Sequence, residues 1–196
     1  MQALTLVEGR AFALTLQRLC HQLIEDHGDL SDTALIGLQP RGVHFSRRLK
    51  QELERDLPGT VITYGELDIT FHRDDFRHRS VTAPSGSTEL DFSLDGRRVV
   101  VVDDVLHTGR SIRAGLDALL SFGRPASVQL MVLIDRRFTR ELPIQPDYVG
   151  KWVDSFDGQR VTVEWQATDG RDRVLLHNTD IRDRAASPDR STPADA

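Results

Sequence analysis

Residues 99–111 read VVVVDDVLHTGRS, and this stretch decides the fold. Val99–Val102 form a run of four β-branched residues, which is typical of a strand buried on both faces. Asp103 and Asp104 follow directly, and residues 108–120 then show a polar turn and helical spacing of apolar residues. A buried strand, a polar loop and a helix in this order are typical of a parallel α/β sheet, in which ligands bind beyond the carboxyl ends of the strands.

Further strands and helices alternate on both sides of this stretch. Apolar spacing predicts a helix, a strand, a helix and a strand before it, and a helix and a strand after the paired acids. The predicted ranges are 8–27, 34–38, 45–57, 60–72, 112–120 and 128–134. Strands that alternate with helices indicate an α/β fold with a mostly parallel central sheet flanked by helices.

The remaining segments differ from this pattern. Residues 73–88 are rich in Arg, His, Asp and Ser and predict a long flexible loop, a kind of segment that is usually functional. Short strands predicted at 148–153, 161–165 and 174–176 indicate a small C-terminal β hood built largely from residues 147–178. Residues 182–196 have the composition of a disordered tail, so we expect a single domain over residues 1–181.

Composition excludes several classes of protein. The 196 residues are 39% hydrophobic and 28% charged, which is ordinary for a globular domain. We find no apolar run long enough for a membrane span and no signal-peptide pattern, so a cytoplasmic protein is expected. The lone Cys20 cannot form an internal disulfide, and the net charge of −5 argues against nonspecific coating of nucleic acid.

The paired acids and the polar turn each indicate one part of a ligand. Two adjacent carboxylates repel unless a cation or hydrogen-bond donors satisfy them, and Mg²⁺ or sugar hydroxyls meet that need. The turn Thr108–Ser111 opens a helix, where free backbone N–H groups favour phosphate. Either feature alone is more often a helix cap or a surface turn, but together, after a valine strand, they predict a site for ribose 5-phosphate. A receiver domain also ends a hydrophobic strand in paired acids, but it normally begins with that strand. Here about half of the chain precedes the valine strand, which disfavours a receiver domain.

Several segments resemble one family beyond this signature. ALIGLQPRGVHFSRRL at 34–49, GELDITFHRDD at 65–75, GRPASVQLMVLIDR at 123–136 and RELPIQPDYVGK at 140–151 are similar to the family of bifunctional pyrimidine operon regulators and uracil phosphoribosyltransferases. The resemblance covers roughly residues 10 to 153. It implies the type I phosphoribosyltransferase fold and binding of phosphoribosyl pyrophosphate (PRPP) with Mg²⁺ as cofactor.

The resemblance also implies roles for individual residues. Asp103, Asp104 and Arg41 are the expected catalytic residues, and the two acids are the expected metal contacts. The expected PRPP-binding residues are Gln39, Pro40, Arg41, Gly42, Arg73, Arg77, Asp103, Asp104, Val105, Leu106, His107, Thr108, Gly109, Arg110 and Ser111. The expected base-binding residues are Asp135, Arg136, Tyr148 and Val149, with Tyr148 stacking on the base.

The expected reaction makes uridine monophosphate (UMP) and diphosphate from uracil and PRPP. Purine-specific relatives often have an acid near position 107, where this chain has His107, so a pyrimidine is favoured. The alternatives are a purine phosphoribosyltransferase and a regulator that binds PRPP or UMP with little catalysis.

The resemblance further implies binding of pyrimidine operon leader RNA, controlled by uridine nucleotides such as UMP or UTP, and assembly into homodimers or larger oligomers. The candidate RNA-binding residues are His21, Arg137, Arg140 and Lys151. Thr139 and Gln145 stand where regulatory relatives tend to carry basic or imidazole groups, which leaves RNA binding open.

Overall fold

A computed structural model describes residues 3–72, 88–156 and 158–178 of the chain. The predicted flexible loop, with Arg73 and Arg77, and the predicted disordered tail therefore lie almost entirely outside the described residues.

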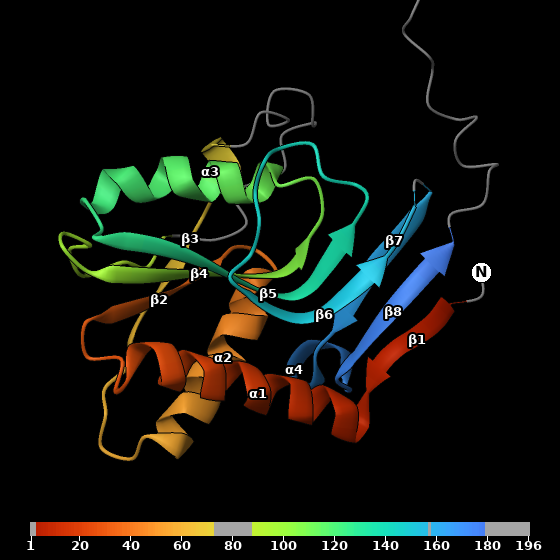
Figure 1. Cartoon of the computed structure of the whole chain (residues 1–196), viewed down its shortest axis with the longest axis horizontal. Coiled ribbons are helices and arrows are strands. Elements are labelled where there is room, and N and C mark those ends of the chain that lie inside the picture. The colour runs from red at the N-terminus through yellow and green to blue at the C-terminus, as the bar shows by residue number, and fades with distance from the viewer. Residues whose placement is uncertain (1–2, 73–87, 157, 179–196) are drawn as a thin grey trace, which may run out of the picture.

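A five-stranded parallel sheet forms the centre of the fold, as the sequence predicted (Figure 1). Its strand order is β3-β2-β4-β5-β6, so the valine strand lies in the middle. The bounds are Thr63–Leu67 for β3, Thr33–Leu38 for β2, Arg98–Leu106 for β4, Ser127–Arg137 for β5 and Tyr148–Asp154 for β6. Because both faces of β4 are covered, Val99–Val102 are all buried.

Helices cover both faces of this sheet. On one face lie α1 (Gly9–His27) and α2 (Gly42–Asp56), and on the other lies α3 (Arg110–Leu119), as Figure 1 shows. Two short 3₁₀ helices, Thr70–His72 and Leu120–Phe122, follow β3 and α3, and a one-turn helix α4 spans Gln166–Asp169. None of the helices in the described ranges is long and apolar enough to cross a membrane.

A second, antiparallel sheet forms the hood, with strand order β1-β8-β7. Its strands are β1 (Ala3–Glu8), β7 (Gln159–Glu164) and β8 (Arg173–Asn178). The prediction that residues 148–153 belong to the hood is wrong, because β6 pairs in parallel with β5 and is the edge strand of the main sheet. In its place the N-terminal strand β1 completes the hood by pairing with β8, at the far end of the chain.

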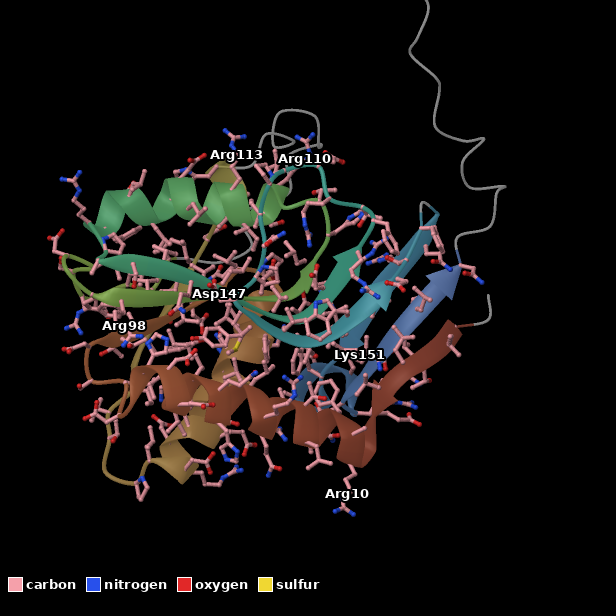
Figure 2. All side chains as sticks on the ribbon, viewed as in Figure 1. Arg10, Arg98, Arg110, Arg113, Asp147 and Lys151 are labelled. Carbon is pink, nitrogen blue, oxygen red and sulfur yellow. The ribbon has the colours of Figure 1, made fainter. Side chains whose placement is uncertain are left out.

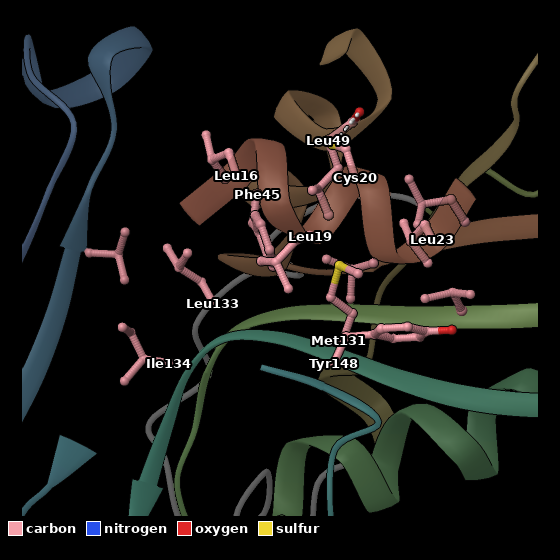
Figure 3. Close-up of a cluster of buried hydrophobic side chains, with 14 of the residues drawn as sticks. Leu16, Leu19, Cys20, Leu23, Phe45, Leu49, Met131, Leu133, Ile134 and Tyr148 are labelled. Atoms are coloured by element: carbon pink, nitrogen blue, oxygen red, sulfur yellow. Dashed lines mark hydrogen bonds between the residues drawn. The ribbon is translucent and has the colours of Figure 1, made fainter. Parts of the chain in front are cut away.

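One continuous core joins the hood to the main sheet. Apolar side chains of α1 and α2 pack on the valine strand and on β5, as the close-up in Figure 3 shows. Trp165, just after β7, meets Phe12 of α1 edge-on at 5.6 Å between ring centroids and stacks on Phe45 of α2 at 6.0 Å. Such aromatic contacts add stability beyond the burial of area, so Trp165 fixes the hood against the two helices.

Replacing Phe45 by alanine is therefore expected to lower the free energy of unfolding by about 3–5 kcal/mol, because the ring is fully buried and leaves a cavity beside Trp165. Urea denaturation measures this change. The exposed Leu120, replaced by alanine as a control, is expected to shift stability by less than about 0.5 kcal/mol. Equal effects of the two substitutions would contradict this description of the core.

Candidate functional site

Asp103 and Asp104 lie at the carboxyl end of β4, and both are buried. The Asp104 backbone N–H donates to Asp103 Oδ1 at 2.9 Å, and Arg41 Nε donates to Asp104 Oδ2 at 3.0 Å. The structure thus brings together the three residues predicted to be catalytic. A carboxylate this deeply buried needs a cation, and Arg41 provides one in this state.

Burial raises the pKa of the Asp104 carboxyl group, and Arg41 offsets only part of that rise. Because the charged form is disfavoured by burial, additional positive charge at this position would bind favourably. The pair is therefore suited to a metal ion or to a substrate that carries one.

The loop after β2 approaches these acids closely. It contains Gln39, Pro40, Arg41 and Gly42, with a cis peptide bond between Gln39 and Pro40. A Cβ atom on Gly42 would lie 2.5 Å from the Val102 carbonyl oxygen and 3.0 Å from Asp103 Cα, so only glycine allows this approach. Arg41 also donates from Nη2 to the carbonyl oxygen of Val163 at 2.6 Å, which ties this loop to the hood.

The predicted phosphate loop links β4 to α3. Gly109 has a φ of 93°, a left-handed conformation that favours glycine, and α3 starts at the next residue, Arg110. The first-turn N–H groups of such a helix point toward the preceding loop, which is the usual arrangement for binding phosphate. Leu106 is buried in the core and Val105 is half-buried against it, so these two have mainly backbone groups to offer a ligand.

Residues 139–145, here called the strap, lie across the phosphate loop. The N–H groups of Glu141 and Leu142 both donate to the Thr108 carbonyl oxygen at 3.1 Å. Arg110, which projects outward from the start of α3 in Figure 2, donates from Nε to Glu141 Oε2 at 2.7 Å. A Cβ on Gly109 would lie 3.2 Å from Ile144 Cδ1. The strap therefore fixes the position of the phosphate loop.

The carboxyl end of β5 supplies Asp135 and Arg136, both buried. Asp135 accepts a hydrogen bond from Nη2 of Arg140 in the strap, and Arg140 Nη1 donates to the His107 carbonyl oxygen. Arg136 is turned toward the hood, where it donates to Ser155 Oγ at 2.8 Å and to the Gln159 carbonyl oxygen at 2.9 Å. Arg140, predicted to bind RNA, thus contacts the phosphate loop and Asp135, and its side chain is only 23% exposed.

Tyr148 and Val149, predicted to bind the base, stand at the start of β6, and both are buried. Across β5, Tyr148 and Val149 stand level with Val102 and Asp103 of β4, and the Tyr148 ring is buried in the core beside Met131 (Figure 3). Its hydroxyl contacts Asp26 Oδ2 at 2.7 Å, His27 Nε2 at 3.1 Å and Gln129 Nε2 at 3.3 Å. The carbonyl oxygen of Val149 accepts a hydrogen bond from Arg18 Nη2 at 3.1 Å.

The other predicted RNA-binding residues lie on the surface. His21 on α1 is 3.7 Å from Asp56, and Arg137 pairs with Asp154 at 2.6 Å. Lys151 is exposed on β6 near α1 (Figure 2). Sequence analysis missed Arg18, one turn before His21, whose guanidinium binds the carbonyl oxygens of Val149 and Gly150 and so lies beside Lys151.

Sequence analysis also missed the hood contacts to the site, from Ser155, Gln159 and Val163. No motif marks these residues, because two of the three contacts use backbone carbonyl oxygens. Only the alternation of Val161 and Val163, which indicated a strand here, gave a signal.

Comparisons with known proteins agree with this geometry. The model of the family described as phosphoribosyl transferase domain matches residues 2–168. The chain is 43% identical over 171 residues to the bifunctional protein PyrR of Desulfosudis oleivorans, covering 87% of this chain and 94% of that protein. It is 45% identical over 161 residues to the bifunctional protein PyrR of Chloroflexus aurantiacus, covering 82% and 87%.

Solved structures show the same fold at low sequence identity. A hypoxanthine phosphoribosyl transferase of Trypanosoma cruzi superposes with a TM-score of 0.66 at 18% identity, covering 94% of this chain and 96% of that one. A hypoxanthine phosphoribosyltransferase of Staphylococcus aureus gives a TM-score of 0.62 at 18% identity, covering 85% and 87%.

Replacing Tyr148 by phenylalanine tests how much its hydroxyl contributes to the stability of the fold. Removing the hydroxyl leaves the buried His27 ring and the Asp26 carboxylate without this partner, so the free energy of unfolding is expected to fall by about 1–3 kcal/mol. Chemical denaturation measures that loss. The KM for a nucleobase is expected to stay unchanged, and a raised KM at unchanged stability would contradict this structural role and favour contact of Tyr148 with the base.

Proposed function

The chain belongs to the phosphoribosyl transferase family and, within it, to the bifunctional PyrR proteins, and from this premise we propose that it is a uracil phosphoribosyltransferase. It transfers ribose 5-phosphate from PRPP to uracil and releases UMP and diphosphate. The observation that supports this most strongly is the buried pair Asp103 and Asp104 directly before a phosphate-binding loop and beside Arg41.

The residues at the paired acids fit a magnesium ion that enters with its substrate. Asp103 and Asp104 offer carboxylate oxygens, which Mg²⁺ prefers. No group of three or more acidic, His or Cys side chains forms a metal site within the described ranges. This fits an ion that takes most of its ligands from substrate phosphates and water. Bound there, Mg²⁺ would neutralise charge on the departing diphosphate.

The protein groups then orient and stabilise the reacting sugar. Arg41, released from Asp104 when the substrate enters, binds the diphosphate, and the close approach at Gly42 lets backbone groups of this loop reach it. Thr108–Ser111 hold the 5-phosphate. Asp103 and Asp104 bind the ribose hydroxyls and stabilise the positive charge that develops on the ring as diphosphate leaves C1. No nucleophilic side chain is required, so rate comes from position and electrostatics.

Base identity requires a direct assay, since the hypoxanthine phosphoribosyltransferases that superpose on this chain show the fold alone. His107, in place of the acid common in purine-specific relatives, favours a pyrimidine. Uracil, hypoxanthine and guanine, each radiolabelled and incubated with PRPP and Mg²⁺, separate the candidates. Formation of UMP at a rate well above that of purine nucleotides supports the proposal, and the reverse order replaces it by a purine enzyme.

A second function, regulation through RNA, is supported by the position of Arg18, His21 and Lys151. Arg18 binds the carbonyl oxygen of Gly150, next to Lys151, so cations of α1 and β6 lie on one side of the protein. A local basic surface can bind RNA phosphates although the whole chain carries a net charge of −5. The proposed ligand is the leader of a pyrimidine operon messenger, bound in response to UMP or UTP.

Four further expectations belong to the same proposal. The chain forms one domain over residues 1–181, it assembles into homodimers or larger oligomers, and it acts in the cytoplasm. Arg73 and Arg77 contact the diphosphate from the loop outside the described residues.

Replacing Asp104 by asparagine separates catalysis from folding. Turnover is expected to fall by about 10²-fold or more, because charge near the cationic sugar is lost. Stability at pH 7 is expected to rise. The pKa of Asp104 is higher in the folded state than in the unfolded state, so ionisation of this carboxyl group destabilises the fold as pH rises through the folded-state pKa. Asparagine does not ionise, so the variant keeps this stability at pH 7.

Steady-state kinetics and thermal melting measure the two effects of this substitution. Unchanged turnover would contradict the catalytic role of Asp104. Asp117 on α3, whose side chain is 49% exposed, serves as the control, and its replacement by asparagine is expected to change neither quantity.

Replacing Lys151 by alanine tests the RNA function. A gel shift with leader RNA and UMP at several salt concentrations is expected to show weaker binding, and a slope of log affinity against log salt smaller by about one. Lys50, which pairs with Glu54 on α2, is the matched control. If the unmodified protein gives no gel shift with this RNA, the RNA function is rejected and only the enzyme function remains.

A further inference from the structure

The charged pair at the carboxyl end of β5 has no role in the mechanism above. We propose that Asp135 and Arg140 read the edge of uracil formed by O4 and N3–H, and that Arg140 is thereby a specificity-determining residue. The inference rests on the proposed uracil transfer and adds to it the groups that recognise the base.

The strand order places the base over β5. The loop that binds diphosphate follows β2, the acids that bind ribose lie near the carboxyl end of β4, and β5 lies on the other side of β4. Displacement at C1 requires the attacking nitrogen to approach opposite the leaving group. With diphosphate on the β2 side, the base therefore lies on the β5 side, where Asp135 ends the strand, level with Leu106 of β4.

The two side chains are held together in a defined position. Arg140 donates one hydrogen bond to Asp135 Oδ1 and one to the His107 carbonyl oxygen, so it is fixed to the phosphate loop. The side chains are 10% and 23% exposed, which leaves them accessible to a small ligand but shielded from bulk water. The neighbouring cation, Arg136, is committed to Ser155 and Gln159 of the hood. In the described part of the chain no hydrogen bond is recorded for Asp135 Oδ2.

This pair matches the chemistry of uracil. A carboxylate accepts from N3–H, and a guanidinium donates to the neighbouring carbonyl oxygen. In the anti conformation of a pyrimidine nucleotide, C6 and C5 lie on the side of the 5-phosphate, so O4 is the ring carbonyl oxygen nearer that side. Because Arg140 is bonded to His107 at the start of the phosphate loop, it faces O4, and Asp135 faces N3–H. Cytosine in the same pose presents an amino group and a bare N3, which is the wrong group at both positions.

Substrate ratios test this assignment independently of overall damage to the protein. The measurements are kcat/KM for uracil, 4-thiouracil, 2-thiouracil and cytosine at saturating PRPP and Mg²⁺. Replacing Arg140 by methionine is expected to lower kcat/KM for uracil and 2-thiouracil by about 10–100-fold. The same substitution is expected to lower kcat/KM for 4-thiouracil much less, because sulfur at position 4 accepts only weak hydrogen bonds from Arg140 in the unmodified protein. Replacing Asp135 by asparagine is expected to shift the uracil-to-cytosine ratio at least about 10-fold toward cytosine.

The matched control is Arg137→Met, which removes an exposed Arg–Asp pair next to the same strand end. This variant is expected to keep all ratios of the unmodified protein. The inference is overturned if Arg140→Met and Asp135→Asn also keep those ratios, even when absolute rates fall. If the unmodified protein converts uracil and only the ratios fail to move, the proposed function stands without this assignment. If it converts no base, both fall together.

Discussion

A buried carboxylate at the end of a central strand is the constraint on which the rest of the structure depends. Asp104 lies near the carboxyl end of β4, almost entirely shielded from water, and burial disfavours its charge. The charge is tolerated because the parallel pairing of β2 with β4 brings Arg41 within hydrogen-bonding distance. That approach requires Gly42, since any side chain there would collide with the Val102 carbonyl oxygen. The buried charge of Asp104 lowers the stability of the fold, but it favours binding of a substrate that brings its own cation.

The central sheet and the phosphate loop could be predicted because their signals are local. A run of four valines, paired acids and a glycine-containing turn specify strand, ligand position and helix start within residues 99–111, and the structure follows that order. The assignment of β6 to the main sheet and of β1 to the hood could not be predicted in this way. The sequence pattern of β6 predicts a short strand like those of the hood. Its place beside β5 is decided by packing against α1. β1 pairs with a strand at the far end of the chain, so no neighbouring residue signals it.

Sequence patterns do not give the direction in which the side chain of a site residue points. Tyr148 stands in a segment that resembles its relatives and begins β6 level with Val102 of β4, but its ring packs in the core and its hydroxyl bonds to Asp26 and His27. Arg140 has the appearance of a surface cation in the sequence. The crossing of the strap over the phosphate loop turns it inward to His107 and Asp135, a contact that depends on the fold of both segments.

The central claim is that residues 103–111 hold ribose 5-phosphate, and a crystal structure of the protein with bound UMP tests it most directly. The account predicts that the phosphate oxygens accept hydrogen bonds from backbone N–H groups of Thr108–Ser111 and that the ribose hydroxyls donate to Asp103 and Asp104, with Arg41 Nε moved away from Asp104. A nucleotide bound elsewhere, with the bond between Arg41 and Asp104 intact and the loop amides turned away from phosphate, would contradict it.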